Sequence, residues 1–339
     1  MKRVVHLGPS ESPGGMSVVI KNMLNYPPQG WEAESISTHG KSIIATLNRW
    51  FSSRRELKRK ISREEVDLAH IHVTHSFSWW RKRGLMRICR KGGIPLAIQI
   101  HSGKFEKFCS GFSGKSVKRE LSEPNRKTIL LEERWKQKLA EWVPEDSVVV
   151  PNFSKSFSNR TDHKLSKKIR LLVLSRDSPG KNHDFAIDIL RALHQRGGSA
   201  SMSMTGVSEY VSERADGLDI DFLGWVDEEK KYELIAESDF LISPSEFEGS
   251  SMSVIESIRS GLPCFVSPAS GETLGIPEMV ISSRDPRKWA EEIMSWSNKK
   301  KYEEAVLMVE RQSERFSPEI SRSILAGIYN DLVDLDHSN

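Results

Sequence analysis

Residues 3–24 read RVVHLGPSESPGGMSVVIKNML, and this stretch decides the fold. A short apolar run ends at Gly8, a turn-rich segment follows, and from Met16 onward apolar residues recur at helical spacing. This order predicts a β-strand, a glycine-rich loop and an α-helix.

The same order of strand and helix recurs along the whole chain. In the first half we expect strands at 67–73, 95–101 and 148–150, with a helix near 78–91. In the second half we expect strands at 169–174, 199–205, 219–223, 239–243 and 263–267, and helices at 182–196, 227–236 and 252–260. Strands that are apolar on both faces and alternate with helices predict parallel sheets covered on both sides. The expected fold class is therefore α/β, with two doubly wound, Rossmann-like domains.

The length of 339 residues also indicates two domains, because it is too long for one ordinary core. A polar stretch without periodicity at residues 153–168 is the expected linker. We therefore expect an amino-terminal domain at 1–165 and a carboxy-terminal domain at 166–339. The final helices of the second domain are expected to pack back towards the first.

Charge differs between the two halves. Residues 1–165 hold 30 Lys and Arg against 16 Asp and Glu, whereas the remainder holds 20 against 30. A basic domain favours anionic partners, which are nucleic acid, lipid headgroups or a phosphate-bearing substrate. A solvated basic face without a partner is the alternative interpretation.

The composition predicts a cytoplasmic protein. The chain has no apolar stretch of the roughly 18 residues that a membrane-spanning helix needs. Its first residues lead directly into a strand rather than into a signal-peptide core. Three widely spaced cysteines without a metal-binding pattern are expected to be free thiols: Cys89, Cys109 and Cys264.

Two loops that follow strands hold residues suited to bind phosphate. Gly14 and Gly15 remove side chains before a helix, so backbone N–H groups can approach an anion; an ordinary tight turn is the alternative. After the strand at 169–174, Arg176 and Lys181 flank a Pro-Gly turn just before a helix. The guanidinium fork of Arg and the point charge of Lys can converge on a pyrophosphate, while a solvated loop is the alternative.

The most informative segment reads SEFEGSSMSVIE over residues 245–256. Glu248 precedes a Gly-Ser turn that opens a helix, and Glu256 follows within that helix, about 10 Å away. The two carboxylates can accept hydrogen bonds from both ends of one ligand, Glu256 from a ribose diol and Glu248 from sugar hydroxyls. A solvated helix face is the alternative. The backbone N–H groups expected to bind phosphates at the start of this helix are those of Ser251, Met252 and Ser253.

In their order, these segments resemble the retaining glycosyltransferases of family four, which include relatives of glycogen and sucrose synthases and bacterial mannosyltransferases. The resemblance spans residues 2 to about 282 and is most specific in the second half. It rests on Gly14-Gly15, a strand ending in His101, Pro151-Asn152, Arg176 with Lys181, and the two glutamates running into Gly261-Leu262-Pro263. The chain departs from the family pattern at Ser102, Ser175 and Ser250-Ser251, which bears on the identity of the donor more than on activity.

The resemblance implies the GT-B fold, in which two Rossmann-like domains face a central cleft. It also implies that the carboxy-terminal domain holds a nucleotide-sugar donor, that the amino-terminal domain holds the acceptor, and that neither a metal nor another cofactor is needed. The implied catalytic residues are His101, Arg176, Lys181 and Glu248. The implied donor-binding residues are Gly14, Gly15, Arg176, Lys181, Glu248, Gly249, Ser250, Ser251, Met252, Ser253 and Glu256.

Two segments of the first half, at 49–60 and 77–83, interleave basic and aromatic side chains. This composition suits a lipid headgroup layer, and a structural basic face is the alternative. Nucleic acid is disfavoured because no recognition motif accompanies the charge. The residues expected on the membrane or acceptor side are Arg54, Arg55, Arg59, Lys60, Trp79 and Trp80.

We therefore expect a retaining hexosyltransferase that uses a UDP- or GDP-linked sugar and a glycan or lipid-linked acceptor. Polysaccharide, lipopolysaccharide or glycolipid assembly at the inner face of the plasma membrane is the expected setting. Two alternatives stay open, a nucleotide-sugar epimerase or hydrolase of the same fold, and a catalytically silent sugar-nucleotide-binding scaffold.

Overall fold

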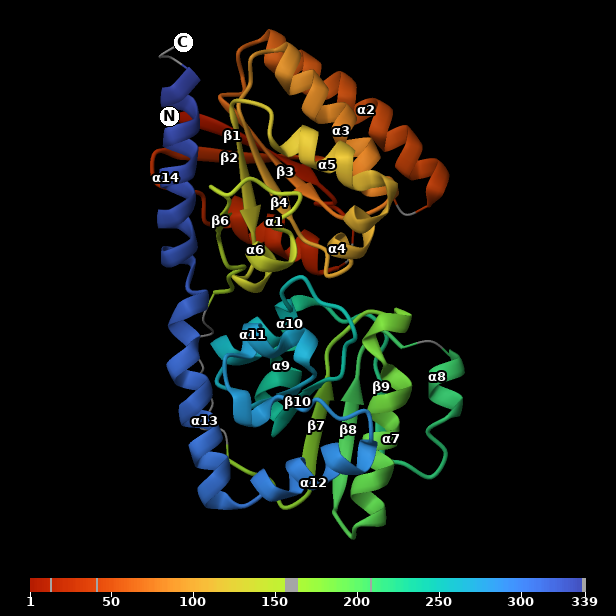
Figure 1. The fold of residues 1–339 in the computed structure, drawn as a ribbon. Helices are drawn as coiled ribbons and strands as arrows, with labels where there is room; N and C mark the ends of the chain where they lie inside the picture. The colour runs from red at the N-terminus through yellow and green to blue at the C-terminus, as the bar shows by residue number, and fades with distance from the viewer. Residues whose placement is uncertain (13, 41, 156–163, 208, 337–339) are drawn as a thin grey trace. The chain divides into compact units, whose positions relative to one another are not determined.

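A computed structural model describes residues 1–12, 14–40, 42–155, 164–207 and 209–336. The chain forms two compact units (Figure 1), the first from residues 1–153 and 318–339 and the second from residues 154–317. Most of the expected linker, at 156–163, lies outside the described residues. Each unit contains one parallel sheet covered by helices, which confirms the expected α/β class with two doubly wound domains.

The first unit has a six-stranded sheet in which all strands run parallel. In spatial order the strands are β2 (Trp31–Ser37), β1 (Lys2–Gly8), β3 (Leu68–Val73), β4 (Leu96–Ile100), β5 (Arg126–Leu130) and β6 (Val148–Val149). One face is covered by α1 (Gly15–Asn25) and by the last helix, α14 (Pro318–Asp336). The other face is covered by α2 (Ile43–Ser62), α3 (Phe77–Lys91), α4 (Phe105–Phe108), α5 (Gly114–Leu121) and α6 (Arg134–Lys138).

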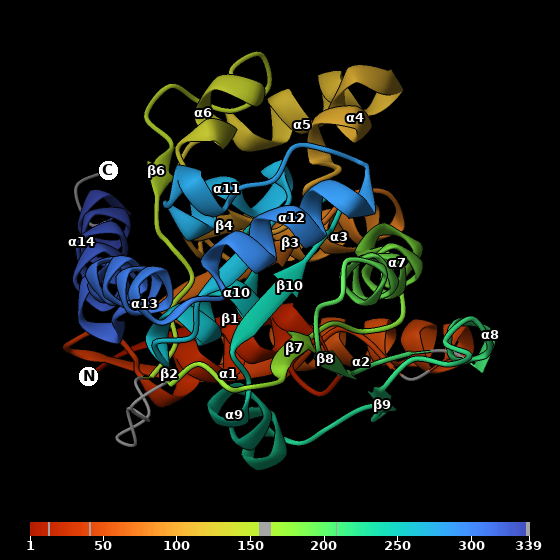
Figure 2. The same cartoon turned by 90° about the horizontal axis from the view of Figure 1, so that it is seen from below.

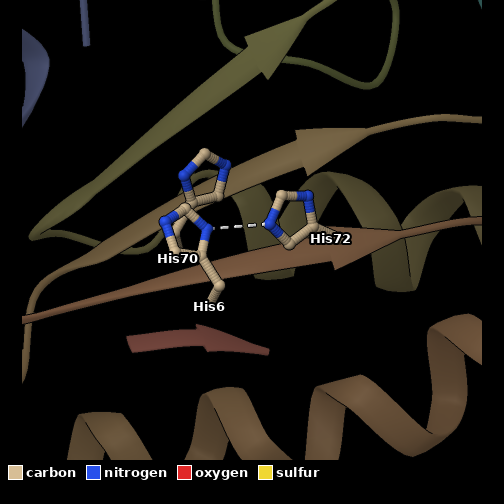
Figure 3. Close-up of side chains that lie close together, drawn as sticks. All are labelled: His6, His70 and His72. Carbon is tan, nitrogen blue, oxygen red and sulfur yellow. Dashed lines mark hydrogen bonds between the residues drawn. The ribbon is translucent and has the colours of Figure 1, made fainter. Parts of the chain in front are cut away.

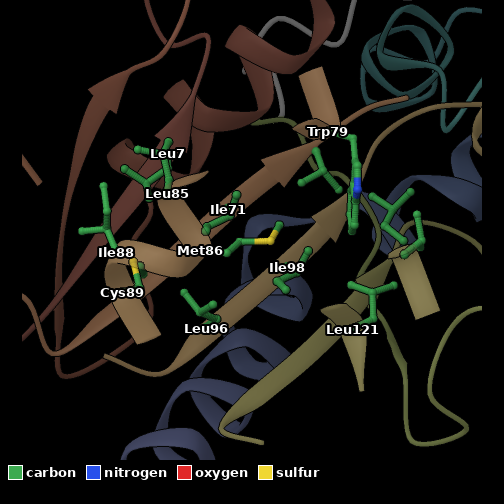
Figure 4. Packing of buried hydrophobic residues seen from close by; sticks show 14 of the residues in the cluster. Leu7, Ile71, Trp79, Leu85, Met86, Ile88, Cys89, Leu96, Ile98 and Leu121 are labelled. Atoms are coloured by element: carbon green, nitrogen blue, oxygen red, sulfur yellow. The ribbon is translucent and has the colours of Figure 1, made fainter. Parts of the chain in front are cut away.

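The apolar core of the first unit lies between the sheet and α3 (Figure 4). Leu85 and Met86 of α3 pack in this core with Ile71 of β3 and Ile98 of β4, and all four side chains are fully buried. Every residue of β3 is buried because helices cover both faces of the sheet. This burial explains the apolar residues of the strand, and it also encloses the two histidines His70 and His72.

Trp79 belongs to the same core, so the expectation that it reaches a membrane is wrong. Its side chain is fully buried, and its ring contacts the ring of Phe105 edge-on at a centroid distance of 5.7 Å. Consecutive helical residues point about 100° apart. Trp79 therefore faces the sheet, while Trp80 stays partly exposed.

The second unit has a five-stranded parallel sheet, of which Figure 2 shows several strands from below. In spatial order its strands are β11 (Cys264–Val266), β10 (Phe240–Ser243), β7 (Ile169–Val173), β8 (Ala200–Met204) and β9 (Ile220–Phe222). Its helices are α7 (His183–Gln195), α8 (Glu209–Glu213), α9 (Glu228–Glu237), α10 (Met252–Arg259), α11 (Gly271–Leu274), α12 (Pro286–Trp296) and α13 (Lys299–Ser313).

The strand order reverses direction once in each sheet. In the first sheet the chain moves from β1 to β2 on one side and to β3 on the other, and in the second sheet from β7 to β8 and later to β10. The helices that follow such neighbouring strands lie on opposite faces, which leaves a crevice at the carboxyl ends of the strands. The loops after β7 and β10 therefore meet at this edge of the second sheet.

Within the described ranges, no helix is both long and apolar enough to cross a bilayer. The three cysteines are buried free thiols, as the sequence predicted. Burial raises the pKa of the Cys89 thiol to about 12, so this group stays protonated at neutral pH.

Candidate functional site

The loop after β7 carries Arg176 and Lys181. The Ser175 N–H donates a hydrogen bond to Thr205 Oγ1 at 3.1 Å, which ties the start of the loop to the end of β8. A 3₁₀ turn at Pro179–Lys181 then leads into α7. The Arg176 side chain is exposed and that of Lys181 is partly buried.

Gly206 allows this loop to lie close to the chain after β8, a role that the sequence analysis missed. Its φ is +57°, and a Cβ at this position would lie 2.2 Å from the Ser175 carbonyl oxygen and 2.6 Å from Arg176 Cα. Its N–H donates to the Gly224 carbonyl at 2.7 Å. Only glycine permits such an approach, but one glycine at the end of a strand is too common a signal to reveal it.

The loop after β10 lies against the loop after β7. The Glu246 N–H donates to the Gly180 carbonyl at 2.9 Å. At the same junction Lys181 Nζ lies 2.5 Å from Glu248 Oε1. The structure thus brings together two of the expected catalytic side chains, with Arg176 in the same loop as Lys181.

Glu256 lies in α10 and is almost fully buried. Its Oε1 accepts a hydrogen bond from Lys231 Nζ of α9 at 2.6 Å. Burial raises the pKa of the Glu256 carboxyl, and the neighbouring Lys231 ammonium opposes that rise. Lys231 could not be singled out from the sequence, because it stands in a run of charges that is typical of a solvated helix.

The start of α10 has the turn that the sequence predicted, with Gly249 and Ser250 before the helix. Ser251 is the N-cap residue, and its N–H donates to Thr273 Oγ1 at 3.3 Å. That N–H therefore already has a partner. Two of the expected phosphate-binding groups remain without an intrahelical partner, the N–H groups of Met252 and Ser253.

The glycine pair of the first unit lies at the start of α1. Gly14 is the N-cap residue with φ 137° and ψ 167°, a conformation that side chains disfavour, and Gly15 is the first helical residue. The Gly14 carbonyl accepts hydrogen bonds from the N–H groups of Ser17 and Val18. The expected strand, loop and helix are confirmed in this segment.

A row of histidines crosses the first sheet (Figure 3). His6 on β1 and His70 and His72 on β3 are fully buried, and their ring nitrogens lie within 4.8 Å of one another. His101 directly follows β4, and its Nε2 lies 2.9 Å from His72 Nδ1. Only His101 was singled out from the sequence, although alternate strand positions such as 70 and 72 point to one face.

Burial keeps these rings neutral at physiological pH. Loss of solvation lowers the pKa of His6 and of His101 to about 3. It also lowers the pKa values of His70 and His72 well below their ordinary range. His101 therefore offers a neutral hydrogen-bonding ring rather than a positive charge.

The segment from β7 to α12 matches a known protein family. A family profile described as Glycosyl transferases group 1 covers residues 168–298, which include both loops and α10. This segment is similar to the group 1 glycosyltransferases. A curated relative, the putative glycosyltransferase EpsF of Bacillus subtilis strain 168, is 32% identical over 124 residues, which cover 33% of this chain and 32% of EpsF. The match thus spans about a third of that relative's length.

Solved structures resemble this chain along most of its length. Sucrose-phosphate synthase from Thermosynechococcus elongatus superposes with a TM-score of 0.77 at 14% identity, covering 99% of this chain and 100% of that protein. HepE from Anabaena, in complex with UDP-glucose, superposes with a TM-score of 0.72 at 14% identity, covering 98% of this chain and 100% of HepE. Pneumococcal GtfA, in complex with UDP and GlcNAc, superposes with a TM-score of 0.62 at 13% identity, covering 82% of this chain and 60% of GtfA. These similarities confirm the GT-B fold.

The buried histidines predict that this protein loses stability in mild acid. Below about pH 6.5 the unfolded chain binds protons at His6, His70 and His72 that the folded chain, with its lowered pKa values, does not bind. The free energy of unfolding should therefore fall between about pH 6.5 and pH 4, by up to about 1.4 kcal/mol per pH unit for each ring. Urea unfolding at several pH values measures this slope. In His70→Gln the slope should correspond to about one proton fewer than in the wild type. A free energy of unfolding that stays constant from pH 7 to pH 5 contradicts the prediction.

Proposed function

We propose that this chain transfers a hexose-type sugar from a UDP-sugar to a hydroxyl group of a glycan or lipid-linked acceptor, with retention of configuration and without a divalent metal. The observation that carries the proposal is that the family match covers the segment in which Lys181 and Glu248 meet. The UDP-glucose complex of HepE and the UDP complex of GtfA, which share the fold, favour uridine as the base.

In the proposed reaction, the bond between the anomeric carbon and the diphosphate oxygen breaks. The acceptor hydroxyl attacks from the same face, and its proton passes to an oxygen of the leaving phosphate. Negative charge therefore grows on the diphosphate, and Arg176 and Lys181 supply positive charge to stabilise it. Lys181 is already held by Glu248, so little reorganisation is needed when the donor binds.

Glu248 and Glu256 are proposed to orient the two ends of the donor. Glu248 would contact the sugar, and Glu256 would accept hydrogen bonds from the ribose hydroxyls. The Lys231 ammonium supports this role, because it favours the ionised carboxylate that burial alone would disfavour. In the first unit, His101 is proposed to contact the donor sugar and Gly15 to approach its phosphate.

We predict that Lys181→Ala lowers kcat by about 100- to 1,000-fold, because it removes charge that stabilises the transition state. Glu256→Ala should lower kcat/KM by a similar factor, because it leaves the partly buried Lys231 without its carboxylate partner and the ribose without an acceptor. Initial rates with UDP-sugars and a panel of acceptors measure both effects. Glu246→Ala is the matched control, since its carboxylate is exposed in the same loop.

Turnover of Lys181→Ala close to that of the wild type would contradict the assigned role. Products tell the alternatives apart, because an epimerase or hydrolase converts the donor without an acceptor, and a silent scaffold binds the donor without turnover. A transferase needs both substrates.

We further propose that α2 contacts an anionic membrane surface. One face of this helix is exposed, with Ile44 at 73% and Phe51 at 57% of full exposure. The exposed apolar residues lie in its first half, at Ile44, Leu47 and Phe51, and the exposed basic residues in its second half, at Arg55, Lys58 and Arg59. An apolar stretch beside a basic one is typical of helices that lie in the headgroup layer. A lipid-linked acceptor at the cytoplasmic leaflet fits this placement.

Two basic residues of the set expected on the membrane side, Arg54 and Lys60, contact other residues of the protein. The Arg54 guanidinium lies over the Trp50 ring at 4.9 Å from its centroid. Lys60 Nζ forms an ion pair with Glu34 at 2.8 Å, and its side chain is mostly buried. The members of the set that stay exposed are Arg55, Arg59 and Trp80.

The double variant Arg55→Ala/Arg59→Ala should bind phosphatidylserine-containing vesicles about 30-fold more weakly than the wild type, because each basic residue contributes about 1 kcal/mol near an anionic surface. Ile44→Ser/Phe51→Ser should also weaken binding, and that loss should persist at high salt because it removes apolar contacts. Vesicle co-sedimentation measures both. The control is Lys299→Ala/Lys300→Ala, which removes two exposed charges from α13. Equal binding by all three variants would refute the membrane face.

A further inference from the structure

Three of the histidines form one hydrogen-bonded chain. His6 Nδ1 lies 3.0 Å from His72 Nε2 (Figure 3), and His72 Nδ1 lies 2.9 Å from His101 Nε2. The chain begins on β1, crosses β3 and ends just beyond β4. It leaves Nδ1 of His101 as the ring nitrogen that faces away from the other two histidines.

The number of protons restricts this chain to two arrangements. Each ring is neutral and so carries one N–H, and each hydrogen bond needs one donor and one acceptor. If His72 carries its proton on Nδ1, it donates to His101 and accepts from His6, so both of those rings are also protonated on Nδ1. If His72 carries its proton on Nε2, both bonds reverse and all three rings are protonated on Nε2. In either case the three rings share one tautomer.

We propose that His72 and His6 are positioning residues for His101, which fix through this shared tautomer whether the free Nδ1 of His101 donates or accepts a hydrogen bond. A group bound at that nitrogen selects the tautomer of all three rings together. The consequence for catalysis rests on the proposed function, in which His101 contacts the donor sugar.

The inner end of the chain is closed. His6 Nε2 is buried and has no hydrogen-bond partner among the described residues. His70 lies beside the chain, but its Nδ1 is bonded to Tyr329 Oη of α14 at 2.6 Å. No described group therefore exchanges a proton with His6 from outside the three hydrogen-bonded rings, and their three protons must shift together. His70 is thus a matched control, equal in burial and strand position but outside the chain.

A cation bound by His6, His70 and His72 is the competing interpretation, because their ring nitrogens lie within 4.8 Å of one another. One observation favours the hydrogen-bonded row. The contact between His6 and His72 already joins two of these nitrogens at 3.0 Å.

The tautomers can be read directly from two-bond ¹H–¹⁵N spectra of protein labelled at its ten histidines, with each ring assigned from a His→Gln variant. We expect His6, His72 and His101 to show the same tautomer at pH 7.5. In His72→Gln the His101 ring should become a mixture of both tautomers, whereas in His70→Gln it should keep the wild-type form. Different tautomers among the three rings, or a coordination shift of their nitrogens on adding Zn²⁺, would overturn the proposal.

Kinetics tests the positioning role separately. His72→Gln should lower kcat/KM about tenfold, as expected for one misplaced hydrogen bond, and His70→Gln should leave it unchanged. An amide fingerprint spectrum verifies that each variant is folded, and His6→Gln provides a second break in the chain. Full activity of both His72→Gln and His6→Gln would overturn the positioning role. If the wild type proves inactive as a transferase, the proposed function fails, while the spectra still decide the shared tautomer.

Discussion

The pairing of β7 with β10 is the constraint on which the proposed donor site depends. These two strands are far apart in sequence but neighbours in the sheet, and the connections that follow them leave in opposite directions. Their loops therefore have to meet at the carboxyl edge of the sheet. The contact between Glu246 and Gly180 and the ion pair of Lys181 with Glu248 are consequences of that pairing. The Lys181 ammonium is in this way held in place without a ligand, which is the arrangement that the proposed stabilisation of a leaving diphosphate requires.

The first sheet reverses at β1 and β3 in the same manner, but there the polar groups are buried and neutral. A row of imidazoles replaces apolar side chains on the face that α1 and α14 cover. Buried polar rings lower stability unless they are hydrogen bonded, and here they mostly bond to one another and to Tyr329. The two units thus differ in their electrostatics, with paired charges in the second and uncharged hydrogen bonds in the first.

Periodicity was sufficient to predict most of the fold. The strand expected at 239–243 is Phe240–Ser243, and the helix expected at 252–260 is Met252–Arg259, because apolar spacing directly reports which positions are buried. The Arg-Lys loop and Glu248 could be found for a related reason, since they lie in loops that follow strands, while Glu256 lies in the helix that comes next. What the sequence could not show depends on contacts between distant segments. Lys231 reaches Glu256 from another helix, and Gly206 is required only because the backbone at Ser175 and Arg176 passes so close to it. Trp79 was misplaced because composition does not reveal which side of a helix faces the core.

Binding of nucleotides to this chain is the most direct test of the proposed donor site. Thermal unfolding would be followed with UDP, GDP, ADP and CMP, all in the presence of EDTA. A ligand that binds only the folded state stabilises it by about 2.7 kcal/mol at 100 times its Kd. We expect UDP to raise the unfolding midpoint and the other nucleotides to raise it less, with no requirement for a divalent metal. The absence of a shift with every nucleotide, or a shift that appears only when metal is added, would contradict the proposed donor site.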